Sequence, residues 1–193
     1  MPIILLLVVL FFVLWAISIY NYFVTTKTRI GASIQEIGNQ LKRQADLIPN
    51  LEASTKGYLK HEKGIFEELT SARKSVVAAA KSGSLKAMAD AGTKLAEVLP
   101  KIQVVVESNP EIKGVEVVKD LMDELRDTSD KVMYARRLLI DLTADYNVKL
   151  VTFPSNIVAG IFHFTAMKGL QTPDGGDFME VSDSDTKTPK VEL

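Results

Sequence analysis

The sequence predicts an all-α protein, with an N-terminal transmembrane helix followed by a long antiparallel helical bundle of three long helices and a short fourth. Three observations predict this class: a charge-free apolar run opens the chain, apolar residues then recur with a helical period, and no segment shows the alternation typical of strands. They divide the 193 residues into a transmembrane anchor at 1–26, a helical bundle at 27–167 and a disordered polar tail at 168–193.

The apolar run covers residues 3–24 and contains no charged side chain. As a helix, its roughly 22 residues extend over about 33 Å, which matches a bilayer hydrocarbon core of about 30 Å. Tyr20 and Tyr22 lie where interfacial aromatic residues are expected, and the first charged residue after the run is Lys27. A cleaved signal peptide would instead need a basic start, a shorter apolar region and a small-residue cleavage site. We therefore interpret the run as a membrane anchor.

Composition narrows the range of functions. The net charge of −1 argues against a dedicated nucleic-acid binder, which would carry a basic patch or stripe. The chain has no cysteine, so disulfides and thiolate metal sites are excluded. Its two histidines, His61 and His163, are too few for a histidine-rich metal site. We therefore expect no cofactor.

The first helix of the bundle is predicted from a heptad seam over residues 30–76, where apolar residues alternate at steps of three and four. This pattern is typical of one long coiled-coil-like helix, which we expect to continue to about residue 81. Three seam positions are polar, namely Gln44, Thr55 and Glu62. Pro49 removes a backbone donor, so a bend is expected near residues 45–49.

Two further long helices follow. Ser84 is a candidate N-cap for the second, which Pro100 is expected to kink and which ends before Ser108. Asn109 is a candidate N-cap for the next helix, with Pro110 at the first helical position. The third helix is predicted to run from there to about residue 150. Its apolar stripe consists of Val118, Leu121, Leu125, Thr128, Val132, Ala135, Leu139, Leu142 and Tyr146.

A break at residues 153–156 precedes a nearly all-apolar segment at 157–167. As a helix this segment is too short to span a bilayer, which needs about 20 residues. From the predicted helix lengths, we expect the segment to begin at the membrane-distal end of the bundle. There it would fold over the core, with Pro154 making the turn and Ile157, Ile161, Phe162 and Phe164 covering the apolar side chains.

Candidate catalytic residues do not form a recognisable pattern. The pair His61-Glu62 lacks the second histidine that the zinc-protease motif requires, since residue 65 is isoleucine. Asp46 and Glu62 are sixteen residues apart, or about 24 Å along a straight helix, which is too far for a shared acid–base site. If Glu62 is buried it needs a cationic partner, and the candidates are Arg73, Arg136 and Arg137. We interpret Arg136 and Arg137 as inward-facing structural groups that neutralise Glu62, Asp46 or both.

Several short blocks are distinctive: Asp-Leu-Ile-Pro-Asn-Leu at 46–51, Lys-His-Glu-Lys at 60–63, Ala-Arg at 72–73, Ala-Arg-Arg at 135–137 and Phe-Pro-Ser-Asn at 153–156. In this order they resemble the LemA family, and the resemblance extends over about residues 20–164. The chain departs from the family at Leu138-Leu139, where Tyr-Asn is usual, and at His163, where glycine is common. The resemblance implies a protein of bacterial type, with one transmembrane helix and an antiparallel bundle, but no specific activity. The candidate structural or interaction residues are Asp46, Pro49, Asn50, Glu62, Arg73, Arg136, Arg137, Phe153, Pro154 and Asn156.

The leading hypothesis is a non-enzymatic, membrane-anchored scaffold or adaptor that mediates protein–protein or self-association. One alternative is an enzyme that uses Asp46, His61 or Glu62, and another is a small-ligand or lipid sensor that uses residues 157–167. We expect the partner to be another protein or a second copy of the chain. Because Lys27, Arg29 and further basic residues follow the anchor, the bundle is predicted on the cytoplasmic side of the cell membrane.

Overall fold

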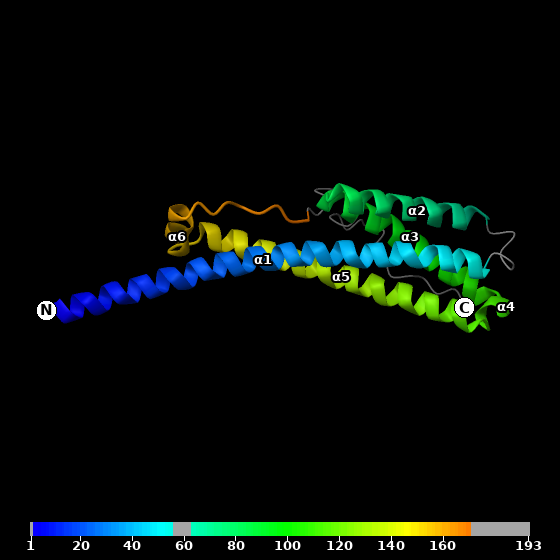
Figure 1. The fold of residues 1–193 in the computed structure, drawn as a ribbon, viewed down its shortest axis with the longest axis horizontal. Coiled ribbons are helices and arrows are strands. Elements are labelled where there is room, and N and C mark those ends of the chain that lie inside the picture. The colour runs from blue at the N-terminus through cyan, green and yellow to red at the C-terminus, as the bar shows by residue number, and fades with distance from the viewer. Residues whose placement is uncertain (1, 56–62, 171–193) are drawn as a thin grey trace, which may run out of the picture.

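A computed structural model describes residues 2–55 and 63–170. Within these ranges the chain is helical, without a strand (Figure 1). The helices are α1 (Pro2–Thr55), α2 (Lys63–Ser82), α3 (Leu85–Ser108), α4 (Pro110–Lys113), α5 (Glu116–Val151) and α6 (Ser155–Ile161). The predicted all-α class, an apolar N-terminal helix leading into an antiparallel bundle, is confirmed.

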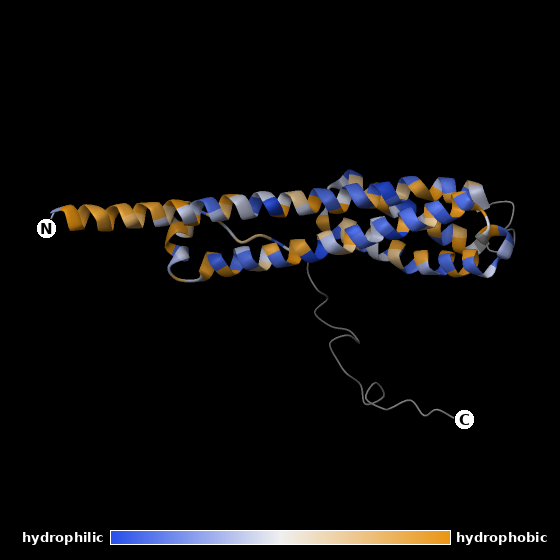
Figure 2. Cartoon of the chain, turned by 90° about the horizontal axis from the view of Figure 1, so that it is seen from below, coloured by the Kyte–Doolittle hydropathy of each residue, from blue (hydrophilic) through white to orange (hydrophobic). Residues whose placement is uncertain are grey.

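The helix α1 consists of two parts with different surroundings. Its N-terminal part projects from the bundle and is apolar on every side, as Figure 2 shows. Its remainder packs along α5, and its buried positions recur at steps of three and four, as the heptad seam predicted. Helical structure continues without interruption through Pro49 to Thr55. The buried positions are Phe23, Thr26, Ile30, Ser33, Ile37, Leu41, Gln44, Ala45, Ile48, Leu51 and Thr55.

The expectation of one helix continuing to residue 81 is wrong, because α2 returns antiparallel along α1. The Thr70 hydroxyl donates a hydrogen bond to the Glu52 carboxylate (2.6 Å), and the Arg73 Nε donates to the Ala45 carbonyl (2.9 Å). Later residues of α2 therefore meet earlier residues of α1. A heptad seam specifies which face of a helix is buried, and both a continuous helix and a helical hairpin satisfy it. The seam itself was correctly placed in α2, where Leu69, Ala72 and Val76 are buried.

The predicted caps of the later helices are confirmed. The Ser84 hydroxyl accepts a hydrogen bond from the Ala87 amide (3.3 Å) at the start of α3, which continues through Pro100. Asn109 caps α4, with Pro110 at its first position. The helix that begins there is shorter than predicted, because residues 114–115 separate α4 from α5.

The apolar stripe of α5 faces α1. Eight of its nine predicted members are buried, and Leu121 is half-buried while its neighbour Met122 is buried instead. Near the C-terminal end of α5, the Tyr146 ring packs edge-on against Phe23, with centroids 5.3 Å apart. Burial raises the pKa of the Tyr146 phenol above its usual range.

The additional reversal changes where α6 lies. We call the end of the bundle around Phe23 the proximal end and the end around α4 the distal end (Figure 1). The Phe162 ring lies 4.7 Å from that of Tyr20, and the Phe164 ring lies 4.8 Å from that of Phe23. Residues 157–164 are therefore at the proximal end, and the predicted distal position is wrong. One unrecognised helix reversal was enough to place the segment at the opposite end.

The predicted domain boundaries stay predictions. The helix α1 is continuous across the proposed boundary between residues 26 and 27, and Phe23, inside the proposed anchor, is buried in the bundle. Of the predicted tail, only residues 168–170 are described, and residues 171–193 lie outside the described part of the chain.

Candidate functional site

The block at residues 46–51 joins α1 to α2 through a backbone carbonyl. Pro49 has no N–H, so the carbonyl of Ala45, four residues earlier, lacks its usual helical donor. Ala45 is fully buried, and an unsatisfied buried carbonyl costs about 1–3 kcal/mol. The Arg73 Nε supplies the missing hydrogen bond at 2.9 Å. Pro49 and Arg73, both selected from the sequence, thus form one structural unit.

The other candidates near this block have different positions. Asp46 and Asn50 are exposed, and Pro49 is half-buried. His61 and Glu62 lie outside the described residues, so the possible pairing of Glu62 is not tested. Among the described residues, Asp46 forms no ion pair with an arginine.

The expectation that Arg136 and Arg137 face inward is wrong. Arg136 is half-buried and Arg137 is exposed, and within the described ranges neither takes part in an ion pair. Ala135, one residue earlier on α5, occupies the core position instead. Because successive helical residues are turned by about 100°, the seam that buries Ala135 directs the two arginines toward its edge and the solvent.

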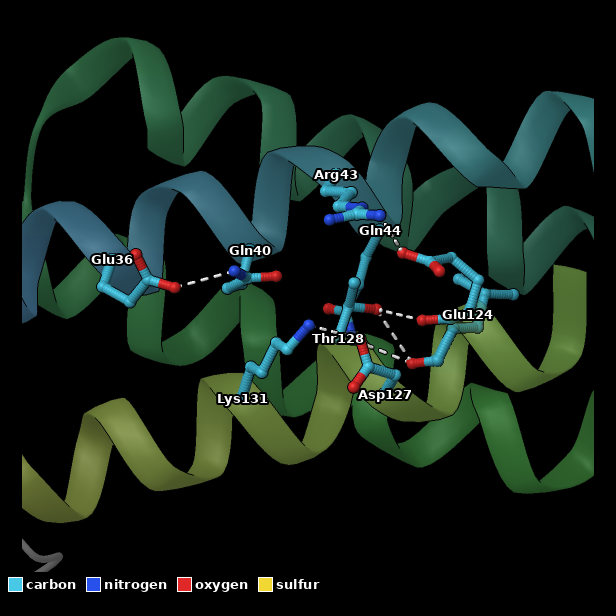
Figure 3. Close-up of polar contacts among 9 residues, drawn as sticks. Glu36, Gln40, Arg43, Gln44, Glu124, Asp127, Thr128 and Lys131 are labelled. Atoms are coloured by element: carbon cyan, nitrogen blue, oxygen red, sulfur yellow. Dashed lines mark hydrogen bonds and ion pairs between the residues drawn. The ribbon is translucent and has the colours of Figure 1, made fainter.

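A polar layer crosses the interface between α1 and α5. Figure 3 shows Gln44 extending from α1 toward α5. Its Nε2 donates a hydrogen bond to the Ser129 hydroxyl (2.7 Å). The Thr128 hydroxyl donates to the backbone carbonyl of Glu124 (2.9 Å), which belongs to the same helix, α5. Arg43 forms an ion pair with Glu124 across the same interface. A single polar position in a heptad seam fixes the register of the two helices at some cost in stability.

A groove with a volume of about 470 Å³ lies beside this layer, between α1, α3 and α5. Small residues of α3 line the groove. A Cβ atom added at one of them, Gly92, would lie 3.2 Å from Leu41 Cδ2, so glycine permits α3 to approach α1 closely. Sequence reasoning missed Gly92, although an isolated glycine inside a helical pattern is a signal of close packing. We call this site the arginine groove; it is lined by Gln44, Gly92, Ala96, Ser129, Asp130, Val132, Met133, Arg136, Arg137 and Ile140.

The remaining candidates, Phe153, Pro154 and Asn156, lie at the turn between α5 and α6. The Ser155 hydroxyl secures this turn by donating to the carbonyls of Lys149 (2.6 Å) and Thr152 (2.9 Å). Phe153 and Asn156 are exposed. Phe153 and Pro154 line a second cavity, of about 400 Å³, which they share with Trp15, Ile19 and Tyr22 of α1 and with the end of α5.

Within residues 2–55 and 63–170, no three histidine or carboxylate side chains lie close enough together to hold a metal ion. What the arrangement offers is a recognition surface, since the arginine groove combines apolar walls with two guanidinium groups at its edge.

The architecture is that of a membrane-associated helical-bundle protein, since α1 is long and apolar enough to cross a bilayer by length and composition. The chain belongs to the LemA family, whose sequence profile matches residues 33–192. It is similar to magnetosome protein MamQ 2 of Paramagnetospirillum magneticum and to magnetosome protein MamQ of Magnetospirillum gryphiswaldense. With each, the identity is 24% over 181 positions, which cover 82% of this chain and 66% of the relative. Neither the family description nor these names point to an enzyme.

Proposed function

We propose that this protein is a single-pass, membrane-anchored scaffold or adaptor whose bundle binds a helical segment of another protein, or of a second copy of itself, in the arginine groove. The observation that carries the proposal is the groove of about 470 Å³, whose lining combines apolar side chains with two arginines and Asp130. In this proposal residues 1–26 form the anchor and residues 27–167 form the binding bundle.

The lining specifies the chemistry of the partner. Met133 is 66% exposed and Ile140 is 46% exposed, so the edge offers apolar contact area that lies open to solvent. A methionine side chain adapts to irregular apolar surfaces, and arginine binds carboxylates in a bidentate geometry. An amphipathic helix with apolar anchors and a neighbouring acidic residue satisfies both features.

Photo-crosslinking in intact membranes tests the groove. A photoreactive residue at Met133 is compared with one at Val104, which is similarly exposed on α3 but lies outside the groove. We expect a discrete crosslinked product from position 133 only, which the double variant Arg136→Glu/Arg137→Glu abolishes. Equal products from both positions, or a solubilised protein that is strictly monomeric and without a partner, would contradict the proposal.

The orientation is a separate part of the proposal. Basic residues that follow the anchor, beginning with Lys27 and Arg29, favour a cytoplasmic bundle in the cell membrane. Because the chain has no cysteine, a Tyr134→Cys variant carries one exposed thiol. An impermeant maleimide should label it only after the cells are permeabilised, and labelling of intact cells would reverse the assignment.

A further inference from the structure

The turn between α5 and α6 exposes a patch of large apolar side chains. Phe153 is 75% exposed, Ile161 is 66% exposed, and about half of the Ile157 and Phe162 side chains is exposed. Water-soluble proteins seldom expose large aromatic and aliphatic side chains together unless another surface covers them. We call these four residues the α6 patch.

The patch is continuous with the apolar surface of α1. The Phe162 ring contacts that of Tyr20, and Phe153 lines the same cavity as Trp15 and Ile19. These three residues of α1 belong to the last part of the charge-free run at residues 3–24. At about 1.5 Å per residue, Tyr20 lies on the order of 6 Å before the end of the run and Trp15 on the order of 14 Å, so the patch lies beside the second half of the run. If α1 crosses a bilayer, the patch begins at the boundary between headgroups and acyl chains and reaches into the acyl chains.

The charged residues near the patch lie at its borders, and one of them, Asp145, lines the same cavity as Phe153 and Trp15. Residues 150–167 include no Asp, Glu, Lys or Arg, and Lys149 and Lys168 bracket them. The Lys149 ammonium lies 4.7 Å from the centroid of the Tyr22 ring. Tyrosine rings and lysines whose charged ends reach outward are the groups expected at headgroup level.

Several backbone groups of the segment have hydrogen-bond partners within the protein. The amide of Phe164 donates to the Ala159 carbonyl (3.0 Å) and that of Phe162 to the Val158 carbonyl (3.1 Å). Where the chain leaves the segment, the Asn147 side chain exchanges two hydrogen bonds of 2.9 Å with the backbone of Met167. Internal partners of this kind are what a backbone needs in order to lie in an apolar medium.

We propose that the α6 patch inserts into the interfacial region of the same bilayer that holds α1, giving the bundle a second, monotopic membrane contact. The occupant of the patch is lipid, because the patch continues a surface that the proposed anchor already presents to lipid. The inference rests on the anchoring role of α1. Two contacts from adjacent elements would fix the tilt of the bundle relative to the membrane and hold the arginine groove at a defined height above it.

Depth-resolved spin labelling of the full chain tests this inference. Single-cysteine variants at Leu10, Ile161 and Val104 carry a nitroxide in vesicles of phosphatidylcholine and phosphatidylglycerol. Leu10 reports the proposed anchor, and Val104 is an exposed apolar control near the end of α3 that precedes α4. We expect the ratio of oxygen to nickel-chelate accessibility to be several-fold higher at Ile161 than at Val104, and to stay below that at Leu10, which lies deeper in the bilayer.

The outcomes separate this inference from the proposed anchor. If Leu10 reports lipid and Ile161 matches Val104, the inference is overturned and the anchor stands. If Ile161 is shielded from both reagents, protein covers the patch, and the inference is again overturned. If Leu10 itself reports water, the anchor fails and the inference fails with it. As a second measurement, Phe162→Glu should raise the nickel accessibility of a label at Phe153, and an unchanged value would count against insertion.

Discussion

The two parts of α1 show how one helix can be built for two environments. Residues 2–22 are apolar on every side, and most of their side chains are exposed. Residues 23–55 carry a mostly apolar stripe at every third or fourth position, and that stripe is buried against α5 and α2. A helix that is apolar all round requires an apolar medium, whereas a helix with one apolar stripe requires a partner on that side. The change of pattern near Phe23 therefore marks where the bundle begins.

Substitution of matched phenylalanines gives the largest expected difference between the two parts. Phe23 is fully buried between the Tyr146 and Phe164 rings, while Phe11 is 64% exposed. We expect Phe23→Ala to lower the free energy of unfolding of the bundle by about 3–5 kcal/mol, because it leaves a cavity in the core. Phe11→Ala should change it by less than about 0.5 kcal/mol. Denaturant titration of the detergent-solubilised protein, followed by circular dichroism, measures both.

Equal losses in the two variants would show that the projecting part of α1 packs onto the bundle in detergent. The comparison between the two parts of the helix would then not hold, and the boundary near Phe23 would lose its meaning.

A smaller effect is expected where α2 joins α1. Arg73→Ala leaves the buried Ala45 carbonyl without a donor, so we expect a loss of about 1–3 kcal/mol. Pro49→Ala restores the N–H that this carbonyl lacks, and Arg73→Ala should then cost clearly less. A double-mutant cycle on the unfolding free energy measures this coupling. Additive effects would mean that the arginine acts independently of the proline.

At the interface of α1 with α5, the expected effect is smaller again. Gln44→Leu preserves most of the side-chain volume but removes the hydrogen bond to Ser129, which is only half-buried and can reach water. The lost hydrogen bond and the gained apolar burial nearly cancel, so stability should change by no more than about 1 kcal/mol. We expect instead that α1 and α5 pair in more than one register. Disulfide trapping between engineered cysteines on the two helices can detect these alternative registers. Unaltered trapping would contradict a register role.

Much of the fold was predictable because burial on a helix leaves a period in the sequence. The seam from Ile30 to Val76, the caps at Ser84 and Asn109 and the stripe of α5 all follow from local rules. The reversal between α1 and α2 was missed because a seam has the same period on one long helix and on two antiparallel ones. Each reversal inverts the direction of every later helix. The missed reversal therefore placed α6 at the wrong end of the bundle.

The candidate site was predicted less well, because it depends on contacts between helices that are distant in sequence. Pro49 and Arg73 were both selected as candidates, yet only the packing of α2 shows that one compensates for the other. Gly92 lines the arginine groove and lets α3 approach Leu41 of α1 closely. The glycine is visible in the sequence of α3, but the helix that it approaches is known only from the packing.

The smallest expected effect concerns Arg136 and Arg137, and it separates them from Arg73. A buried ion pair would make the loss of either arginine cost about 3–5 kcal/mol, as the inward-facing interpretation required. Because Arg136 is half-buried and Arg137 exposed, with no ion pair among the described residues, we expect each alanine variant to stay within about 0.5 kcal/mol of the wild type. The same denaturant titration measures this, with Arg73→Ala as the internal reference. If stability is retained while the crosslink from Met133 disappears, the two arginines act in recognition. A loss of several kcal/mol would instead mean that they support the bundle, and the arginine groove would lose its claim as a binding site.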